Sequence, residues 1–122
     1  MNFIKVIIFL VGFLSVFHVN ALGIQEKKLF ENVKSGILRN VRQALDRGAD
    51  FNAIDECGWT ALHYAAYFGH LNVVIELLDM KCNSRIKTPQ GKTAYDLAKE
   101  QQHTSIMIEL FARSAVDSIC PF

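Results

Sequence analysis

The sequence predicts an all-α fold, a solenoid of helix-turn-helix units joined by hairpin fingers. Two observations support this prediction. First, the stretch from Gly58 to Leu71 contains a tight turn, a short apolar helix, a glycine break and the start of a second helix. Second, the same pattern recurs 33 positions away in both directions. A period of roughly 20 to 50 residues is typical of solenoids, in which each unit buries its apolar face against the next.

The repeat can be followed residue by residue. Moved forward by 33 positions, the central stretch meets identical residues at several places: Gly58 and Gly91, Thr60 and Thr93, Ala65 and Ala98, His70 and His103. Moved backward, it meets others: Leu62 and Leu29, Gly69 and Gly36, Val74 and Val41, Leu78 and Leu45. The chain therefore contains three units, at about residues 25–54, 55–87 and 88–113, which together form one domain over residues 25–113.

Residues 1–21 have the pattern of a secretory signal peptide. Lys5 precedes an apolar run over residues 6–17, and the small residue Ala21 has Val19 two positions before it, as at a cleavage site. The run is shorter than the roughly 20 residues that a membrane-spanning helix needs. We therefore expect cleavage after Ala21 and a secreted or periplasmic domain without membrane contact. An uncleaved amino-terminal anchor is the alternative.

The charge of the domain argues against nucleic acid as a partner. The whole chain has 13 Lys and Arg residues and 12 Asp and Glu residues. Loss of Lys5 with the signal peptide leaves equal numbers of both signs. A neutral domain lacks the basic face that phosphate binding requires, and it has no long-range attraction for nucleic acid.

The first unit is expected to cap the solenoid. Its helices are predicted over residues 25–34 and 37–47, each with apolar residues at helical spacing. Gly48 can adopt the left-handed conformation that ends the second of them. The charged stretch 25–28 occupies the place of a solvent-facing cap, which terminal repeats need for solubility.

The second and third units follow the same plan. Residues 50–59 are expected to form an extended finger, after which the hydroxyl of Thr60 caps the next helix by accepting a backbone N–H. In the third unit the outer helix is predicted over residues 104–113, with Phe111 among the buried positions. Residues 114–122 show little periodicity, so we expect an irregular tail.

The central unit resembles the ankyrin repeat. The family motif Thr-Pro-Leu-His-x-Ala stands here as residues 60–65, Thr-Ala-Leu-His-Tyr-Ala, and Gly-His-Leu at 69–71 matches a further family position. The resemblance covers residues 25–111. It implies a protein-binding module that uses its concave face and finger tips, with another protein as partner, no cofactor, no catalysis and a monomeric state.

Several residues depart from the family pattern. Lys81 replaces the usual glycine, and a non-glycine residue in a left-handed cap costs roughly 1 kcal/mol. Arg85 replaces the asparagine that normally braces the finger, so the second finger, residues 83–92, is expected to be looser than the first. Asp96 occupies the position of the motif histidine in the third unit.

The histidines are interpreted as structural. The resemblance implies that His63 hydrogen-bonds the finger backbone and the threonine hydroxyl, and His70 and His103 lie one period apart at the start of outer helices. No nucleophile turn and no pair of acids beside a base occur at motif spacing, so we expect no catalytic residues. The acidic pair Asp55-Glu56 is interpreted as a solvated finger tip.

The resemblance also implies a partner-binding site. Aromatic residues at the finger and at the end of the inner helix fall at family positions that project onto the concave face, where aromatic anchors often dominate binding. The predicted set is Ile54, Glu56, Cys57, Trp59, Tyr67 and Phe68. The alternative is that these rings fold over the chain's own finger or under its tail.

Three cysteines leave a second function open. An odd number leaves at least one thiol without an internal partner, and the spacing of Cys57, Cys82 and Cys120 does not suggest a zinc site. Cys82 stands where the family has a buried alanine, so it is expected in the core. The alternative function is a redox-responsive module using Cys57 and Cys120, or a small-ligand module whose aromatic patch receives a ligand such as haem.

Overall fold

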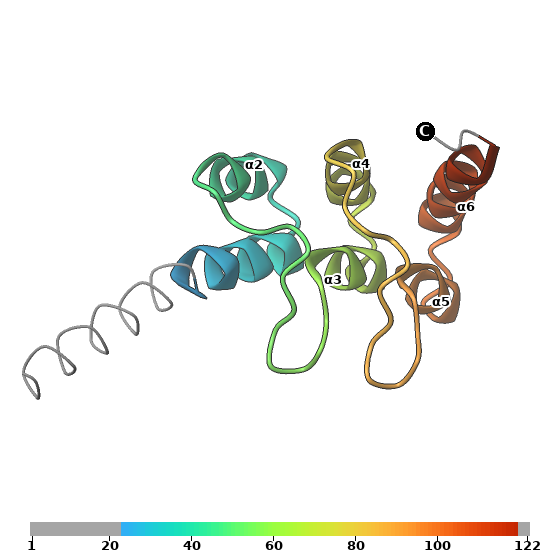
Figure 1. Ribbon diagram of the computed structural model, residues 1–122, viewed down its shortest axis with the longest axis horizontal. Coiled ribbons are helices and arrows are strands. Elements are labelled where there is room, and N and C mark those ends of the chain that lie inside the picture. Colours follow the sequence, from blue (N-terminus) through green and yellow to red (C-terminus); the bar gives the residue numbers. More distant parts are fainter. Residues whose placement is uncertain (1–22, 120–122) are drawn as a thin grey trace, which may run out of the picture.

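The computed structural model describes residues 23–119. Helices alternate between an inner and an outer layer along a single row (Figure 1). The labelled helices are α2 (Leu38–Asp46), α3 (Ala61–Phe68), α4 (Leu71–Asp79), α5 (Ala94–Glu100) and α6 (Thr104–Ile119), and a further helix covers residues 23–35. This part of the chain contains no strand. The predicted all-α solenoid is confirmed.

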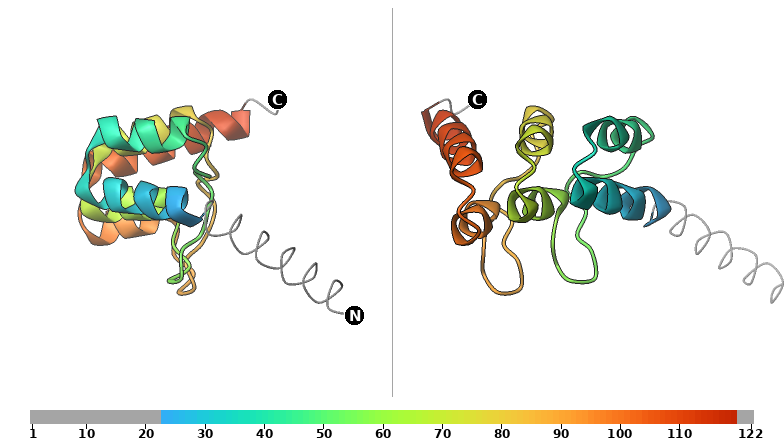
Figure 2. Two further views of the ribbon diagram at one scale, coloured as in Figure 1. Left: turned by 90° about the vertical axis from the view of Figure 1, so that its left-hand side faces the viewer. Right: turned by 180° about the vertical axis from the view of Figure 1, so that it is seen from behind.

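The inner layer consists of the helix over residues 23–35, α3 and α5, and the outer layer consists of α2, α4 and α6. The two fingers project side by side from one side of the row (Figure 2). The predicted signal peptide and Cys120 lie outside the described residues.

Threonine caps start the inner helices at the predicted positions. The Thr60 hydroxyl accepts the backbone N–H of His63, and the His63 ring accepts the backbone N–H of Thr60. Thr93 and Asp96 form the same reciprocal pair at the start of α5. Each cap satisfies backbone donors that the first helical turn leaves free, an effect worth about 1 kcal/mol.

One apolar core runs through all three units. Its fully buried side chains recur at repeat spacing: Leu29 and Leu62, Val41 and Val74, Val73 and Ile106. Burying each such side chain stabilises the fold by roughly 1.5 to 3 kcal/mol. Because α3 packs against α5 and α4 packs against α6, no unit buries its apolar face alone.

The second finger has its own internal support. Its backbone carries the same hydrogen bond as the first, since Thr88 N–H donates to the Lys92 carbonyl at 2.8 Å. The fingers are also linked, because the Asn83 N–H donates to the Asn52 side chain at 2.8 Å. Arg85 lies 33 positions after Asn52, and a guanidinium cannot accept such a bond.

Two expectations for the last helix are wrong. The outer helix does not end near residue 113 but continues to Ile119, because no glycine or proline interrupts residues 114–119. The predicted irregular tail is therefore helical over that stretch. Phe111, expected in the core, is 68% exposed. Its counterpart one period earlier, Leu78, is buried, because α6 covers the central unit and no described helix covers the last.

Two non-glycine residues occupy left-handed positions, at φ 60° for Lys81 and 61° for Gln102. The first was predicted, and the second was not, although Gly69 lies one period before it. We expect Lys81→Gly and Gln102→Gly each to stabilise the fold by about 1 kcal/mol. Urea unfolding followed by circular dichroism measures this. Equal or lower stability in both variants would contradict a strained backbone at these caps.

Candidate partner-binding surface

Asp55 organises the first finger (residues 50–59). Its Oδ1 atom accepts the N–H groups of Cys57 and Trp59, both at 3.0 Å, and its Oδ2 atom accepts the hydroxyl of Tyr64. Burial and the Asp55 carboxylate raise the pKa of Tyr64 above its ordinary range. The interpretation of Asp55 as merely solvated is therefore wrong, since it ties the finger tip to α3.

Trp59, Tyr67 and Phe68 form a continuous group, here called the aromatic surface. The ring centroids of Trp59 and Tyr67 lie 5.5 Å apart, and those of Tyr67 and Phe68 lie 5.2 Å apart, both edge to face. Such pairs contribute about 0.5 to 1.5 kcal/mol beyond their buried area. The group leads from the base of the finger to the end of α3.

The buried ring of Tyr64 packs against the aromatic surface. The centroid of the Tyr64 ring lies 5.0 Å from that of Trp59. The Lys34 ammonium lies 4.4 Å from the Tyr64 centroid. Trp59 also packs against the core. Half-buried Trp59 therefore belongs partly to the fold.

The remaining predicted site residues lie on the finger or at its edge. Ile54 is 58% exposed, Glu56 and Cys57 are exposed at the tip, and Phe68 is 47% exposed at the carboxyl end of α3. Tyr67 is half-buried. The structure thus joins the three aromatic residues by direct ring contact.

His63 is structural, as the motif implied. It is 1% exposed, its Nδ1 atom accepts the Thr60 N–H at 2.9 Å, and its Nε2 atom donates to the Ile86 carbonyl at 2.8 Å. Burial lowers the pKa of His63 below 6.5. The unfolded chain therefore takes up this proton first, and stability declines as pH falls from 6.5 through the folded pKa.

His70 and His103 connect neighbouring units by one repeated arrangement. Their Nε2 atoms lie 2.9 Å and 3.0 Å from the carbonyl oxygens of Lys34 and Tyr67, respectively, in the preceding units. Each imidazole occupies the space above a left-handed glycine of that unit. The second of these contacts fixes the backbone of Tyr67 and thus the aromatic surface.

The cysteines give no support to the redox alternative. Cys57 is exposed and Cys82 is buried, and neither forms a disulfide within the described residues. Burial raises the pKa of the Cys82 thiol to about 12, so it behaves as a small core residue, as predicted. Cys120, the other cysteine of the redox alternative, lies outside the described range.

Neither a metal site nor a membrane-spanning helix is present in residues 23–119. No group of three or more histidine, cysteine or acidic side chains is arranged to hold a metal ion there. None of the helices described is long and apolar enough to cross a membrane.

Stacked helix pairs, capped by threonine, linked by histidines and carrying parallel fingers, define a helical repeat protein. A family model described as ankyrin repeats, three copies, matches residues 29–118. The chain therefore belongs to the ankyrin-repeat family, which confirms the resemblance seen in the sequence.

Curated relatives share the repeats over part of their length. The chain is 32% identical over 84 residues to human ankyrin repeat domain-containing protein 40, covering 68% of this chain and 23% of that protein. It is 38% identical over 63 residues to the Notch-regulated ankyrin repeat-containing protein of Xenopus tropicalis, covering 51% of this chain and 55% of that protein. The match to mouse 2-5A-dependent ribonuclease, 32% over 74 residues, covers 60% of this chain and 10% of that protein.

Proposed function

We propose that this chain binds another protein through the aromatic surface and the tip of the first finger, without catalysis. Ankyrin repeats are generally protein-interaction modules, and the chain contains three of them. The observation that supports this site is the half-exposed Phe68, backed by Tyr67 and Trp59 in direct ring contact. Aromatic residues that are rigid and partly exposed are the usual energetic centres of interfaces.

The mechanism is rigid presentation. Asp55 ties the tip of the first finger to α3, and the Nε2 atom of His103 lies 3.0 Å from the carbonyl oxygen of Tyr67. Side chains that are already ordered lose little conformational entropy when a partner docks, so more of the contact energy appears as affinity.

Polar residues border the aromatic surface on both sides. Lys34 and Ser35 occupy the corresponding positions in the preceding unit, and Glu100 and Gln101 occupy them in the following unit; all four are exposed. A central aromatic group with a polar rim is the usual anatomy of a protein interface. The partner is therefore expected to insert an apolar side chain between polar contacts.

Replacing Phe68 with alanine is expected to weaken partner binding about thirtyfold, equivalent to roughly 2 kcal/mol. Phe68 is the appropriate residue because Trp59 packs against the core and its loss would also affect folding. Met80→Ala is the matched control, since Met80 is 38% exposed at the end of α4 in the outer layer. Binding is measured by calorimetry, with the melting temperature as the folding check. If the two variants bound the partner with equal affinity, the aromatic surface would be excluded as the partner-binding site.

We also propose that residues 1–21 direct export and are removed after Ala21. The support is the sequence pattern of a basic residue, an apolar run and a small residue at the cleavage position. Intact mass of the expressed protein is the test. A mature chain beginning at Leu22 is expected, and a chain that retains Met1 in the cytosol would refute export.

A further inference from the structure

Among the described residues, the third unit, α5 and α6, exposes side chains whose counterparts in the central unit are buried. Phe111 lies one period after buried Leu78, and half-buried Tyr95 lies one period after buried Leu62. Ile108, on the same helix as Phe111, is 64% exposed. In the central unit the corresponding face is covered by α5 and α6 themselves. The last unit therefore presents the surface that elsewhere receives a pair of helices.

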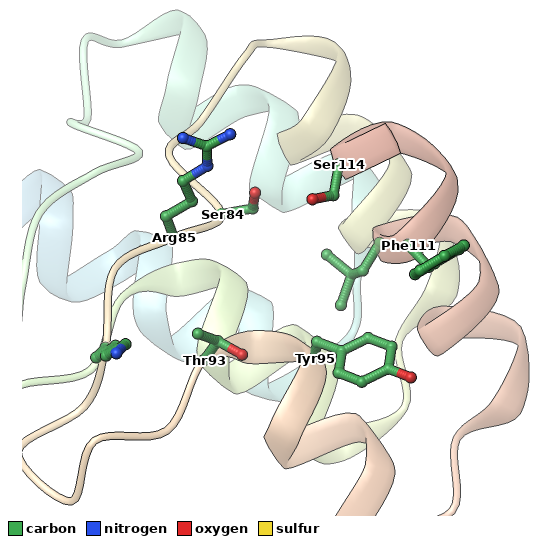
Figure 3. Close-up of a pocket in the computed structure, with 8 residues that line it drawn as sticks. Ser84, Arg85, Thr93, Tyr95, Phe111 and Ser114 are labelled. Atoms are coloured by element: carbon green, nitrogen blue, oxygen red, sulfur yellow. The ribbon is translucent and has the colours of Figure 1, made fainter. Parts of the chain in front are cut away.

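This face contains a groove of about 460 Å³. Arg85 on the second finger lies on one side of the groove, and Tyr95 and Phe111 lie on the other (Figure 3); Leu110 of α6 also lines it. Most of the surface inside is apolar. An exposed apolar groove of this kind usually marks a contact site.

The charged residues that line the groove are all basic. Its lining includes Arg85 and Lys87 but no carboxylate. Neither cation forms an ion pair with any residue that the structure describes, while Lys92 nearby is already paired with Glu100 at 2.6 Å. Arg85 is therefore available to an acidic ligand, and Lys87, whose charge also lowers the pKa of the Asp96 carboxylate, adds positive charge to the same lining.

The opposite end of the solenoid is different. The helix over residues 23–35 exposes Lys27, Lys28 and Glu31 and buries Leu29 and Val33 beneath them. The described residues of that unit expose these charged side chains together with Ile24 and Ile37, whereas the groove at the α6 end is mainly apolar. A head-to-tail stack of copies would place the apolar groove against charged side chains, which disfavours a second copy as its occupant.

We propose that the groove between the second finger, α5 and α6 binds a helical segment of another protein that has an apolar stripe flanked by acidic residues. The helical form follows from the position, which in the central unit is filled by helices. The apolar stripe packs on Tyr95 and Phe111, and the acidic residues pair with Arg85 and Lys87. This site lies one unit away from the aromatic surface and does not depend on it.

Selection from a phage-displayed library of random peptides of roughly 16 residues, about 24 Å long as a helix, tests the proposal on the full chain. The selected peptides are synthesised and their affinities measured by calorimetry at low and high salt. Phe111→Glu and the double variant Arg85→Glu, Lys87→Glu change the groove. Phe68→Ala changes the aromatic surface, and Ile24→Glu, 52% exposed at the other end, is the matched control.

The expected peptides are rich in Asp and Glu, become helical on binding and bind less tightly in high salt. Each groove variant weakens them at least tenfold, while Phe68→Ala and Ile24→Glu leave them unchanged. The proposal is overturned if no selected peptide depends on Phe111, or if those that do have no excess of acidic residues. A dimer in sedimentation that Phe111→Glu converts to monomer would also overturn it, because a second copy would then fill the groove.

Discussion

Replacing His63 with alanine is expected to lower the free energy of unfolding by roughly 3 kcal/mol. The ring is 1% exposed and links the cap of α3 to the second finger through Thr60 and Ile86. Alanine would leave the Thr60 N–H and the Ile86 carbonyl without these partners, each a loss of about 1 to 3 kcal/mol when buried. Urea unfolding at pH 7 measures the change.

The third unit provides a matched control for this variant. Asp96 lies at the same position of the repeat and caps α5 through Thr93, but its carboxylate only accepts hydrogen bonds and therefore cannot donate to a finger carbonyl as His63 does. Asp96→Ala should therefore cost only about 1 kcal/mol, the value of a cap. Equal losses for the two variants would show that the bond from His63 to the finger contributes nothing. His63→Ala should also reduce the decline in stability below pH 6.5, because the lowered pKa of His63 causes part of it.

Replacing Gly69 with alanine is expected to destabilise the fold by about 3 kcal/mol. Gly69 has φ +80°, and a Cβ atom there would lie 2.7 Å from the ring of His103. The substitution thus combines a left-handed backbone with a clash against the histidine that joins the second and third units. Thermal unfolding of the variant measures the cost.

Replacing Gly48 with alanine measures the backbone part of that cost without the clash. The φ of Gly48 is +91°, but nothing lies within 4 Å of a Cβ placed there, so Gly48→Ala should cost only about 1 kcal/mol. In a His103→Ala background, Gly69→Ala should fall to the same value, because the ring is gone. Additive losses in this double-mutant cycle would mean that the ring and the glycine do not interact.

Much of the fold could be predicted because repeat spacing and helix caps are local signals. The motif around Thr60 and His63 indicated both the start of α3 and the role of the imidazole. The left-handed position of Lys81 followed from the family pattern, which has a glycine there, as this chain has Gly48 one period earlier. Gln102 was missed although the same comparison, with Gly69, was available in the sequence.

Other features depend on tertiary contacts that spacing does not contain. Asp55 was interpreted as solvated because its hydrogen bond to Tyr64 joins residues nine positions apart across a turn, and no sequence motif indicates such a contact. Phe111 was placed in the core because its repeat position is apolar, but burial there requires a covering helix. For the same reason, the sequence indicated the aromatic residues of the surface without showing that Trp59 is partly committed to the core.

The central claim is that this chain binds a protein through the aromatic surface, and site-specific photo-crosslinking tests it most directly. p-Benzoylphenylalanine replaces Phe68 in one sample and Met80 in the other, since these side chains are 47% and 38% exposed in opposite layers. After irradiation of cells that express each variant, we predict that the crosslinker at position 68 captures a discrete partner protein. The crosslinker at position 80 should not capture this protein. The same products from both positions, or none from position 68, would contradict the claim.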